Sequence, residues 1–448
     1  MKRIGIVLPI FSLPSGPEGV ALGDVGRYLE FLDSCGVHLW QILPLNPTDV
    51  HGSPYGSYSL NGGNLAFLDE ALLEQEGLFA PGAFRFSALK EERLLQGLRL
   101  GEVAQLPGYR EFRKKPWALA TALYRHFMAL YGTGDVRQWG EEGDFKRALE
   151  WAAAPEVEAH LALEFLFHRQ WGQVMDFAHS LGISIVGDLP YYPGKFSVEA
   201  WAFPGDFKLE DGRILASGGV PPDGFSQEGQ YWDTPVYDQE AMAQNGHAMW
   251  RERISEALER FDYVRLDHFR GLDQVFEIPA GKSPRQGHWQ PVAGLEILEG
   301  FSRERLLAED LGFLDESFHS FARKAGIRGM EVMVFEDGSA PPRPEKVYYT
   351  GNHDTESLAQ FAKRAQSMDH WRKKLPQVNR AQLLTEALHR ENSWVMVQHV
   401  DFFDGTEDFR INTPGTSRGN WRAKIGPQLM GREARDIIKS TVRKAGRK

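Results

Sequence analysis

The chain has 448 residues, of which 42% are hydrophobic and 25% charged, and this ordinary globular composition excludes wholesale disorder. Its net charge of −10 argues against a general nucleic-acid binder, because such proteins present a basic surface to phosphate groups. Cys35 is the only cysteine, which excludes both an intramolecular disulfide and a cysteine-rich zinc site.

The first apolar run of the chain covers residues 4–11, behind a short basic start. Pro9 interrupts this run, and Glu18 follows where a signal peptide would carry small residues for cleavage. We therefore interpret the run as a buried first strand. No stretch reaches the roughly 18 apolar residues that a membrane span requires. A cytoplasmic enzyme without a membrane partner is expected.

Eight short apolar runs bounded by turn residues predict eight strands. Most are continuously apolar, which is typical of parallel strands covered on both faces. The runs are residues 4–10, 38–45, 183–189, 263–268, 306–310, 330–335, 347–350 and 394–400. Helical periodicity precedes several of them, at residues 26–35, 158–181, 249–261 and 314–325. This alternation predicts right-handed βαβ units closed into a (β/α)8 barrel.

The predicted strands are unevenly spaced, which indicates insertions into the barrel. We interpret residues 46–182 as the main inserted subdomain, mostly helical, behind a loop at 46–64. Its predicted helices cover residues 88–98, 116–131 and 145–153. Residues 193–238 are rich in Gly, Pro and aromatics, and we interpret them as an irregular loop insertion at the active site. Residues 1–448 are thus expected to form one catalytic barrel.

Several predicted strands end in charged or ionisable residues. In a barrel, the carboxyl ends of the strands meet at one mouth, where active sites lie. The residues in question are Asp188, Arg265, Asp267, His268, Glu309, Asp310, His353 and Asp354. Carboxylates carried by different strands can therefore converge on one pocket.

Single members of this set also have structural interpretations. Asp188 could cap a turn after its strand, and Arg265 could form an ion pair with Asp267. These last two residues lie two positions apart, so they share one face of the strand, while Val264 and Leu266 take the other. Because charges end several strands at once, caps alone do not explain them, and we expect a charged pocket.

Other reaction classes lack their motifs here. The histidines form no His-x-His pair, and no P-loop or dinucleotide-binding glycine motif occurs, so no metal or cofactor is expected. The Gly-x-Ser-x-Gly match at residues 415–419 lies outside any strand-to-helix turn, and we interpret it as a chance match. Clustered carboxyl groups fit glycosidic-bond chemistry, in which burial and like charge keep one acid protonated while another stays ionised.

Aromatic residues are abundant, with 12 Trp, 13 Tyr and 28 Phe. Their rings offer flat apolar faces to sugar rings, and a place in a loop favours binding over core packing. The candidates in loops are Tyr55, Tyr58, Tyr191, Tyr192, Trp201, Phe203, Phe207, Phe225, Tyr231, Trp232 and Trp421.

A set of motifs resembles the amylomaltases, the 4-α-glucanotransferases of glycoside hydrolase family 77 in the α-amylase clan. The most specific are Arg-Leu-Asp-His-Phe-Arg-Gly at residues 265–271 and Ala-Glu-Asp-Leu-Gly at 308–312. The others lie at residues 53–57, 187–190, 219–223, 229–232, 349–354, 412–415 and 419–422. The resemblance implies a (β/α)8 barrel with inserted subdomains and no C-terminal β-sandwich.

The resemblance also implies roles for individual residues. Asp267 would be the nucleophile that forms a β-glucosyl-enzyme, and Glu309 the acid and then the base. Asp354 would bind ring hydroxyls and favour the distorted transition state. The implied substrate-binding residues are Arg265, which holds Asp267 ionised, His353, His268, Asp188, Tyr55, Trp232, Phe225, Asn420 and Asp310.

Three functions remain open at this stage. The first is a 4-α-glucanotransferase acting on maltooligosaccharides and α-1,4-glucans by double displacement. The second is a retaining α-glucan hydrolase, or a transferase with altered acceptor choice, on the same barrel. The third is an inactive sugar-binding protein, against which the three retained acids argue. The sequence does not indicate an oligomeric state.

Overall fold

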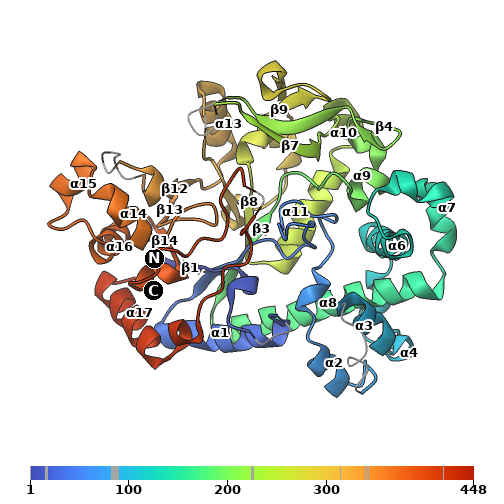
Figure 1. Cartoon of the computed structure of the whole chain (residues 1–448), viewed down its shortest axis with the longest axis horizontal. Helices are drawn as coiled ribbons and strands as arrows, with labels where there is room; N and C mark the ends of the chain where they lie inside the picture. The colour runs from blue at the N-terminus through green and yellow to red at the C-terminus, as the bar shows by residue number, and fades with distance from the viewer. Residues whose placement is uncertain are drawn as a thin grey trace.

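A computed structural model describes residues 2–15, 19–81, 90–222, 227–312, 314–337, 339, 341, 343–416 and 418–447. Eight parallel strands form one sheet that curls into a barrel (Figure 1). They are β1 (Arg3–Val7), β2 (Leu39–Gln41), β3 (Ser184–Leu189), β8 (Tyr263–Leu266), β11 (Leu306–Ala308), β12 (Met330–Val332), β13 (Val347–Tyr349) and β14 (Trp394–Gln398). Each lies within, or within one residue of, a predicted strand, and the (β/α)8 barrel is confirmed.

The strands follow one another around the barrel in chain order, so that β14 pairs with β1. The seam between β11 and β12 closes through a single parallel bridge, Leu307 to Arg328, where Ala308 N donates to Arg328 O at 2.8 Å. A side chain extends this seam: Asp310 Oδ1 accepts from Met330 N at 2.7 Å. Lys346 then pairs with the same carboxylate.

The core lies inside the barrel and between the barrel and its helices. Ile6 and Val7 of β1 point to opposite faces of the strand and both are buried, as a strand covered on both faces requires. Helix α1 (Leu22–Cys35) buries Val25, Leu29 and Leu32 at helical spacing. Other helices lie between or after the barrel strands in the chain: α8 (Pro155–Ser180), α11 (Ala248–Arg260), α13 (Glu316–Ala325), α14 (Leu358–Ala365), α15 (Asp369–Lys374), α16 (Arg380–His389) and α17 (Arg432–Ala445).

A helical subdomain stands between β2 and β3, at the right of Figure 1. Its helices are α2 (Glu70–Gln75), α3 (Lys90–Gly97), α4 (Leu100–Val103), α5 (Tyr109–Phe112), α6 (Pro116–Tyr131) and α7 (Phe145–Ala148). The predicted helix at 145–153 is split, because its second half is the 3-10 turn Leu149–Trp151. The long helix α8 connects this subdomain to β3. The boundaries 46–182 stay a prediction.

Residues 193–238 differ from the irregular loop that we expected. They contain α9 (Val198–Ala202), β4 (Leu209–Glu210), β5 (Arg213–Ile214), β6 (Ala216–Val220) and β7 (Gln230–Pro235), before α10 (Gln239–Gln244). β6 and β7 join β9 (Gln274–Pro279) and β10 (His288–Pro291), which follow β8, in an antiparallel sheet ordered β10-β9-β6-β7 (top of Figure 1). The helix α12 (Gly294–Ile297) comes next. We did not predict β6 because its glycines are typical of turns. The packing requires glycine here, since a Cβ on Gly219 would lie 2.2 Å from Gln230 O.

The segment after β14 ends in a helix that packs beside the barrel's first helix. Within the described residues, no strand follows β14, and residues 405–416 and 418–426 contain no helix or strand. Helix α17 buries Ala434, Ile438 and Val442 against its neighbours, which include α1. Among the described residues, no helix combines the length and apolarity needed to cross a bilayer.

Candidate active site

The carboxyl ends of β3, β8 and β11 lie side by side and bring three acids to one mouth. Asp188 of β3 pairs in register with Arg265 of β8. The ladder continues past the strand ends, because Asp267 N donates to Leu189 O at 3.1 Å and Glu309 N to Leu266 O at 3.0 Å. Parallel pairing alone therefore places Asp188, Asp267 and Glu309 together.

A single arginine nitrogen connects two of these acids. Arg265 Nη1 donates to both oxygens of Asp188 at 2.8 Å and to Asp267 Oδ1 at 2.9 Å. Burial lowers the pKa of Arg265, but Asp188 and Asp267 more than offset this effect and keep its pKa well above the usual value. A permanent positive charge thus stands beside Asp267.

Glu309 occupies a different environment from Asp267. Its Oε2 accepts from His268 N at 2.9 Å. Burial raises the pKa of Glu309 well above its ordinary value, Arg265 opposes the rise, and the charge of Asp267 adds to it. The site therefore favours a protonated Glu309 next to an aspartate that is paired with arginine. One proton donor and one potential nucleophile are the result.

His268 shapes the turn between these two acids. Its backbone is left-handed, with φ of 47°, a conformation that costs energy for a residue with a side chain. This turn aims the His268 N–H at Glu309. The imidazole meets the Trp232 ring edge to face at 5.0 Å. Burial lowers the pKa of His268 to about 4, so the ring is neutral at neutral pH.

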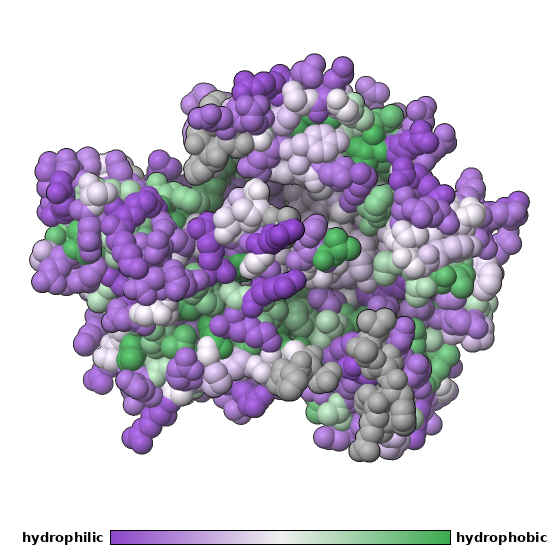
Figure 2. Space-filling model, in the orientation of Figure 1, coloured by the Kyte–Doolittle hydropathy of each residue, from purple (hydrophilic) through white to green (hydrophobic). Residues whose placement is uncertain are grey.

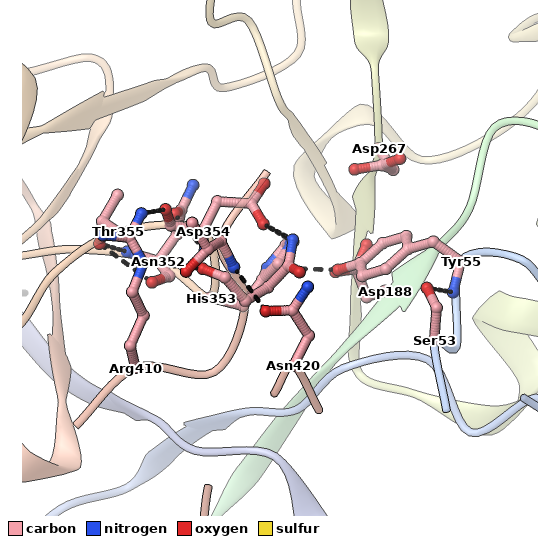
Figure 3. A network of polar contacts seen from close by, with 12 residues as sticks. Ser53, Tyr55, Asp188, Asp267, Asn352, His353, Asp354, Thr355, Arg410 and Asn420 are labelled. Atoms are coloured by element: carbon pink, nitrogen blue, oxygen red, sulfur yellow. Dashed lines mark hydrogen bonds and ion pairs between the residues drawn. The ribbon is translucent and has the colours of Figure 1, made fainter. Parts of the chain in front are cut away.

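Tyr55 connects the acids of the barrel to the loop that follows β13 (Figure 3). Its hydroxyl donates to Asp188 Oδ2 at 2.7 Å and lies 3.3 Å from His353 Nδ1. The rings of Tyr55 and His353 stack at 4.8 Å. The Trp421 ring lies beside both, with its centre 5.8 Å from that of Tyr55 and 5.9 Å from that of His353.

Asp354 is held by a segment distant in sequence. Its Oδ1 accepts from Asn412 Nδ2 at 2.6 Å and lies 3.5 Å from His353 Nε2. Its backbone carbonyl accepts from Arg410 at 2.8 Å. The Asp354 side chain is 35% exposed and that of Asp267 24%, so both are open to a ligand, whereas Arg265 and Asp188 are enclosed.

The remaining predicted residues are placed differently. Asn420 is buried and folds its own loop, accepting from Thr413 N at 3.0 Å and donating to Thr416 O at 2.8 Å. Asp310 is bound to Met330 N and Lys346 at the barrel seam. Phe225 lies outside the described residues. Contact of these three with a substrate stays a prediction.

Sequence reasoning missed one neighbour of the site, Asn412, as a site residue. It lies inside the motif at 412–415, so the motif itself was the available signal. Trp421 was among the predicted loop aromatics, and the structure places its ring beside Tyr55 and His353. Among the described residues, no group of three or more His, Cys, Asp or Glu side chains has the arrangement of a metal site. Figure 2 shows the surface hollowed near the centre of the view, within mostly hydrophilic surroundings.

The barrel and its cluster of carboxylates define a (β/α)8 enzyme whose chemistry rests on acidic side chains. The sequence profile of glycoside hydrolase family 77, described as 4-alpha-glucanotransferase, matches residues 8–428. The chain is 33% identical to the 4-alpha-glucanotransferase of Aquifex aeolicus, over 95% of this chain and 96% of that one. It is 32% identical to the enzyme of Thermus thermophilus, over 95% of each. The chain belongs to the 4-alpha-glucanotransferase family, and the expected transferase activity is confirmed.

Solved structures agree on the fold. The amylomaltase from Streptococcus agalactiae, solved in complex with acarbose, superimposes with a TM-score of 0.89 at 24% identity, over the whole of both chains. The amylomaltase from Corynebacterium glutamicum gives a TM-score of 0.74 at 19% identity and covers all of this chain and 75% of that one. These likenesses support the barrel with its insertions.

Proposed function

We propose that this chain moves α-1,4-glucan segments between maltooligosaccharides with retention of configuration, using Asp267 as nucleophile and Glu309 as acid and base. The observation that carries the assignment is the contrast between the two carboxyl groups. Asp267 receives a hydrogen bond from Arg265, while burial and the charge of Asp267 raise the pKa of Glu309. This contrast matches the two states that the first step requires.

In the first step, Asp267 attacks the anomeric carbon of the donor sugar. The bond from that carbon to the leaving oxygen breaks, and Glu309 gives its proton to that oxygen. In the second step, ionised Glu309 takes the proton of an acceptor hydroxyl. The acceptor oxygen then displaces Asp267 from the anomeric carbon and restores both carboxyl groups.

Residues around the two acids would hold the sugar. We assign Asp354 and His353 to the hydroxyls of the reacting sugar. Tyr55 links His353 to Asp188, and Asp354 lies 3.5 Å from His353. Neutral His268 can either donate or accept a hydrogen bond there. Trp232 packs on His268, so its ring is available as an apolar wall for the sugar.

Transfer differs from hydrolysis only in the nucleophile of the second step. Incubation with maltotriose separates the two, because transfer yields glucose together with oligomers longer than maltotriose. Glucose and maltose without longer products would instead indicate a hydrolase, and an inactive sugar-binding protein would leave maltotriose intact. Asp267→Asn and Glu309→Gln are the matched controls, and each should abolish product formation. A cytoplasmic location and the lack of a nucleic-acid partner stay predictions.

A further inference from the structure

A fully buried carboxylate, Asp401, lies behind the loop that carries His353 and Asp354. It belongs to the 3-10 turn His399–Phe402 that follows β14, and its exposed fraction is 0%. It is no part of the cluster at the barrel mouth. The family motifs that we recognised do not include it.

Asp401 accepts hydrogen bonds from both ends of the loop between β13 and α14. Thr350, the first residue after β13, donates its hydroxyl to Asp401 Oδ2 at 2.6 Å. Leu358, the first residue of α14, donates its N–H to Asp401 Oδ1 at 2.7 Å. One carboxylate thus binds the residues at both ends of the segment 351–357.

The interior of the loop is tied to the same strand end. Gln398 N donates to Thr350 Oγ1 at 3.1 Å, and Gln398 Nε2 lies 3.2 Å from Glu356 O. Thr355 Oγ1 donates to Asn352 O at 3.0 Å. Asn352 Oδ1 then accepts from Asp354 N at 3.0 Å. Gln398 Nε2 also donates to Thr355 Oγ1 at 3.4 Å, so a continuous chain of hydrogen bonds connects the end of β14 to the backbone of Asp354.

The burial of Asp401 is costly, which argues that its contacts matter. Both donors to the carboxylate are neutral, and Arg380 donates instead to the backbone carbonyl of Asp401 at 2.9 Å. Burial raises the pKa of Asp401 to about 7, and the bonds from Thr350 and Leu358 oppose that rise. The charge of Arg380 also opposes the rise, yet a fully buried carboxyl group whose hydrogen-bond donors are neutral is rare in proteins.

We propose that Asp401 is a positioning residue, which holds Asp354 and His353 at the barrel mouth by clamping both ends of their loop. This inference rests on the proposed role of Asp354 in binding the reacting sugar. The competing explanation is purely structural, because a carboxylate that accepts from Leu358 N also caps α14. The two explanations differ in what they predict for turnover below the unfolding temperature.

The test compares variants at each contact in the full chain, with kcat and KM for maltotriose and Tm measured together. Asp401→Asn keeps the size of the side chain but can accept only one of the two hydrogen bonds. Thr350→Val removes the hydroxyl that donates to Asp401 Oδ2, and Thr350→Ser keeps a hydroxyl at this position. Asn379→Ala removes the cap of α16, where Asn379 accepts from Gln382 N, and serves as the control for lost stability alone.

If Asp401 positions the loop, Asp401→Asn and Thr350→Val each lower kcat by about tenfold or more with a smaller change in KM. The double variant is then no worse than the poorer single one, because both break the same contact. Thr350→Ser keeps kcat within about twofold, and Asn379→Ala lowers Tm alone. A fall in Tm without a fall in kcat for both Asp401→Asn and Thr350→Val overturns the inference.

Asp354→Asn separates this inference from the proposed function on which it rests. If Asp354→Asn abolishes turnover while Asp401→Asn and Thr350→Val do not, only the positioning role of Asp401 fails. If Asp354→Asn also turns over normally, the proposed role of Asp354 fails, and the inference about Asp401 falls with it. Should Asp401→Asn not fold, Thr350→Val against Thr350→Ser decides the matter.

Discussion

Arg265 Nη1 lies 2.9 Å from Asp267 Oδ1 and at the same time 2.8 Å from both oxygens of Asp188. One cation thus serves an enclosed aspartate and an aspartate open to a ligand. Asp188 orients the guanidinium, and the guanidinium donates to the carboxyl group that would attack the sugar. The reactivity of Asp267 should therefore depend on the geometry of the arginine as well as on its charge.

Arg265→Lys tests that dependence while the charge is kept. A lysine presents a compact ammonium group on a flexible chain and should not hold the same geometry toward both aspartates. We expect kcat to fall by about 100-fold on maltotriose, with the fold retained by circular dichroism. A lysine variant with parental kcat would show that charge alone suffices.

The raised pKa of Glu309 predicts the alkaline side of the activity profile. The first step needs the protonated acid, so activity is present below the pKa of Glu309 and declines as the pH rises through it. That decline should lie well above the ordinary carboxyl range. In Glu309→Gln, the remaining turnover of a donor with a fluoride leaving group should lose this decline, because such a donor needs no proton. Persistence of the decline would assign it to another group.

The same group predicts how stability changes with pH. Because folding raises the pKa of Glu309, its contribution to stability is complete below its unfolded pKa and is lost as the pH rises through the folded pKa. A glutamine mimics the protonated acid at every pH. The Tm of Glu309→Gln relative to the parent should therefore increase as the pH rises above the ordinary pKa of a glutamate. A constant difference would contradict the raised pKa.

Tyr55→Phe removes one hydroxyl that serves Asp188 and faces His353. The enclosed carboxylate of Asp188 loses a donor, which should cost about 1.5–3 kcal/mol of stability. We also expect a higher KM, because the two sides of the mouth lose their link. Tyr109→Phe is the matched control: its hydroxyl donates to Glu158 at 2.7 Å in the inserted subdomain, so KM should not change. Equal KM values for the two variants would show that the Tyr55 hydroxyl does not contribute to substrate binding.

The sequence predicted the barrel strands and the acids that follow them, because apolar runs and their charged ends are local features. Asp310 was predicted to bind substrate, but the alternation of side chains along an extended chain predicts the opposite. Adjacent residues of an extended chain face opposite sides, so with Glu309 at the mouth its neighbour points away, to Met330 N and Lys346. The contact between Asp354 and Asn412 joins segments 58 positions apart, which no local pattern reveals.

The antiparallel sheet beside the barrel was missed for a different physical reason. Its strand β6 carries Gly218 and Gly219, where a Cβ would collide with Tyr192 and with Gln230 O. Glycine is typical of turns in a sequence pattern, yet here it permits close approach of a neighbouring backbone. Strand propensity therefore gave no signal at the residues that the packing requires to be glycine.

The proposed mechanism requires a covalent bond between Asp267 and the donor sugar, which peptide mass spectrometry can detect. Glu309→Gln is incubated with a maltooligosyl fluoride, so that the first step needs no acid and the second lacks its base. We expect a sugar adduct on the peptide that contains Asp267, absent from the Asp267→Asn, Glu309→Gln double variant. An adduct on another carboxylate, or inverted product with no adduct, would contradict it.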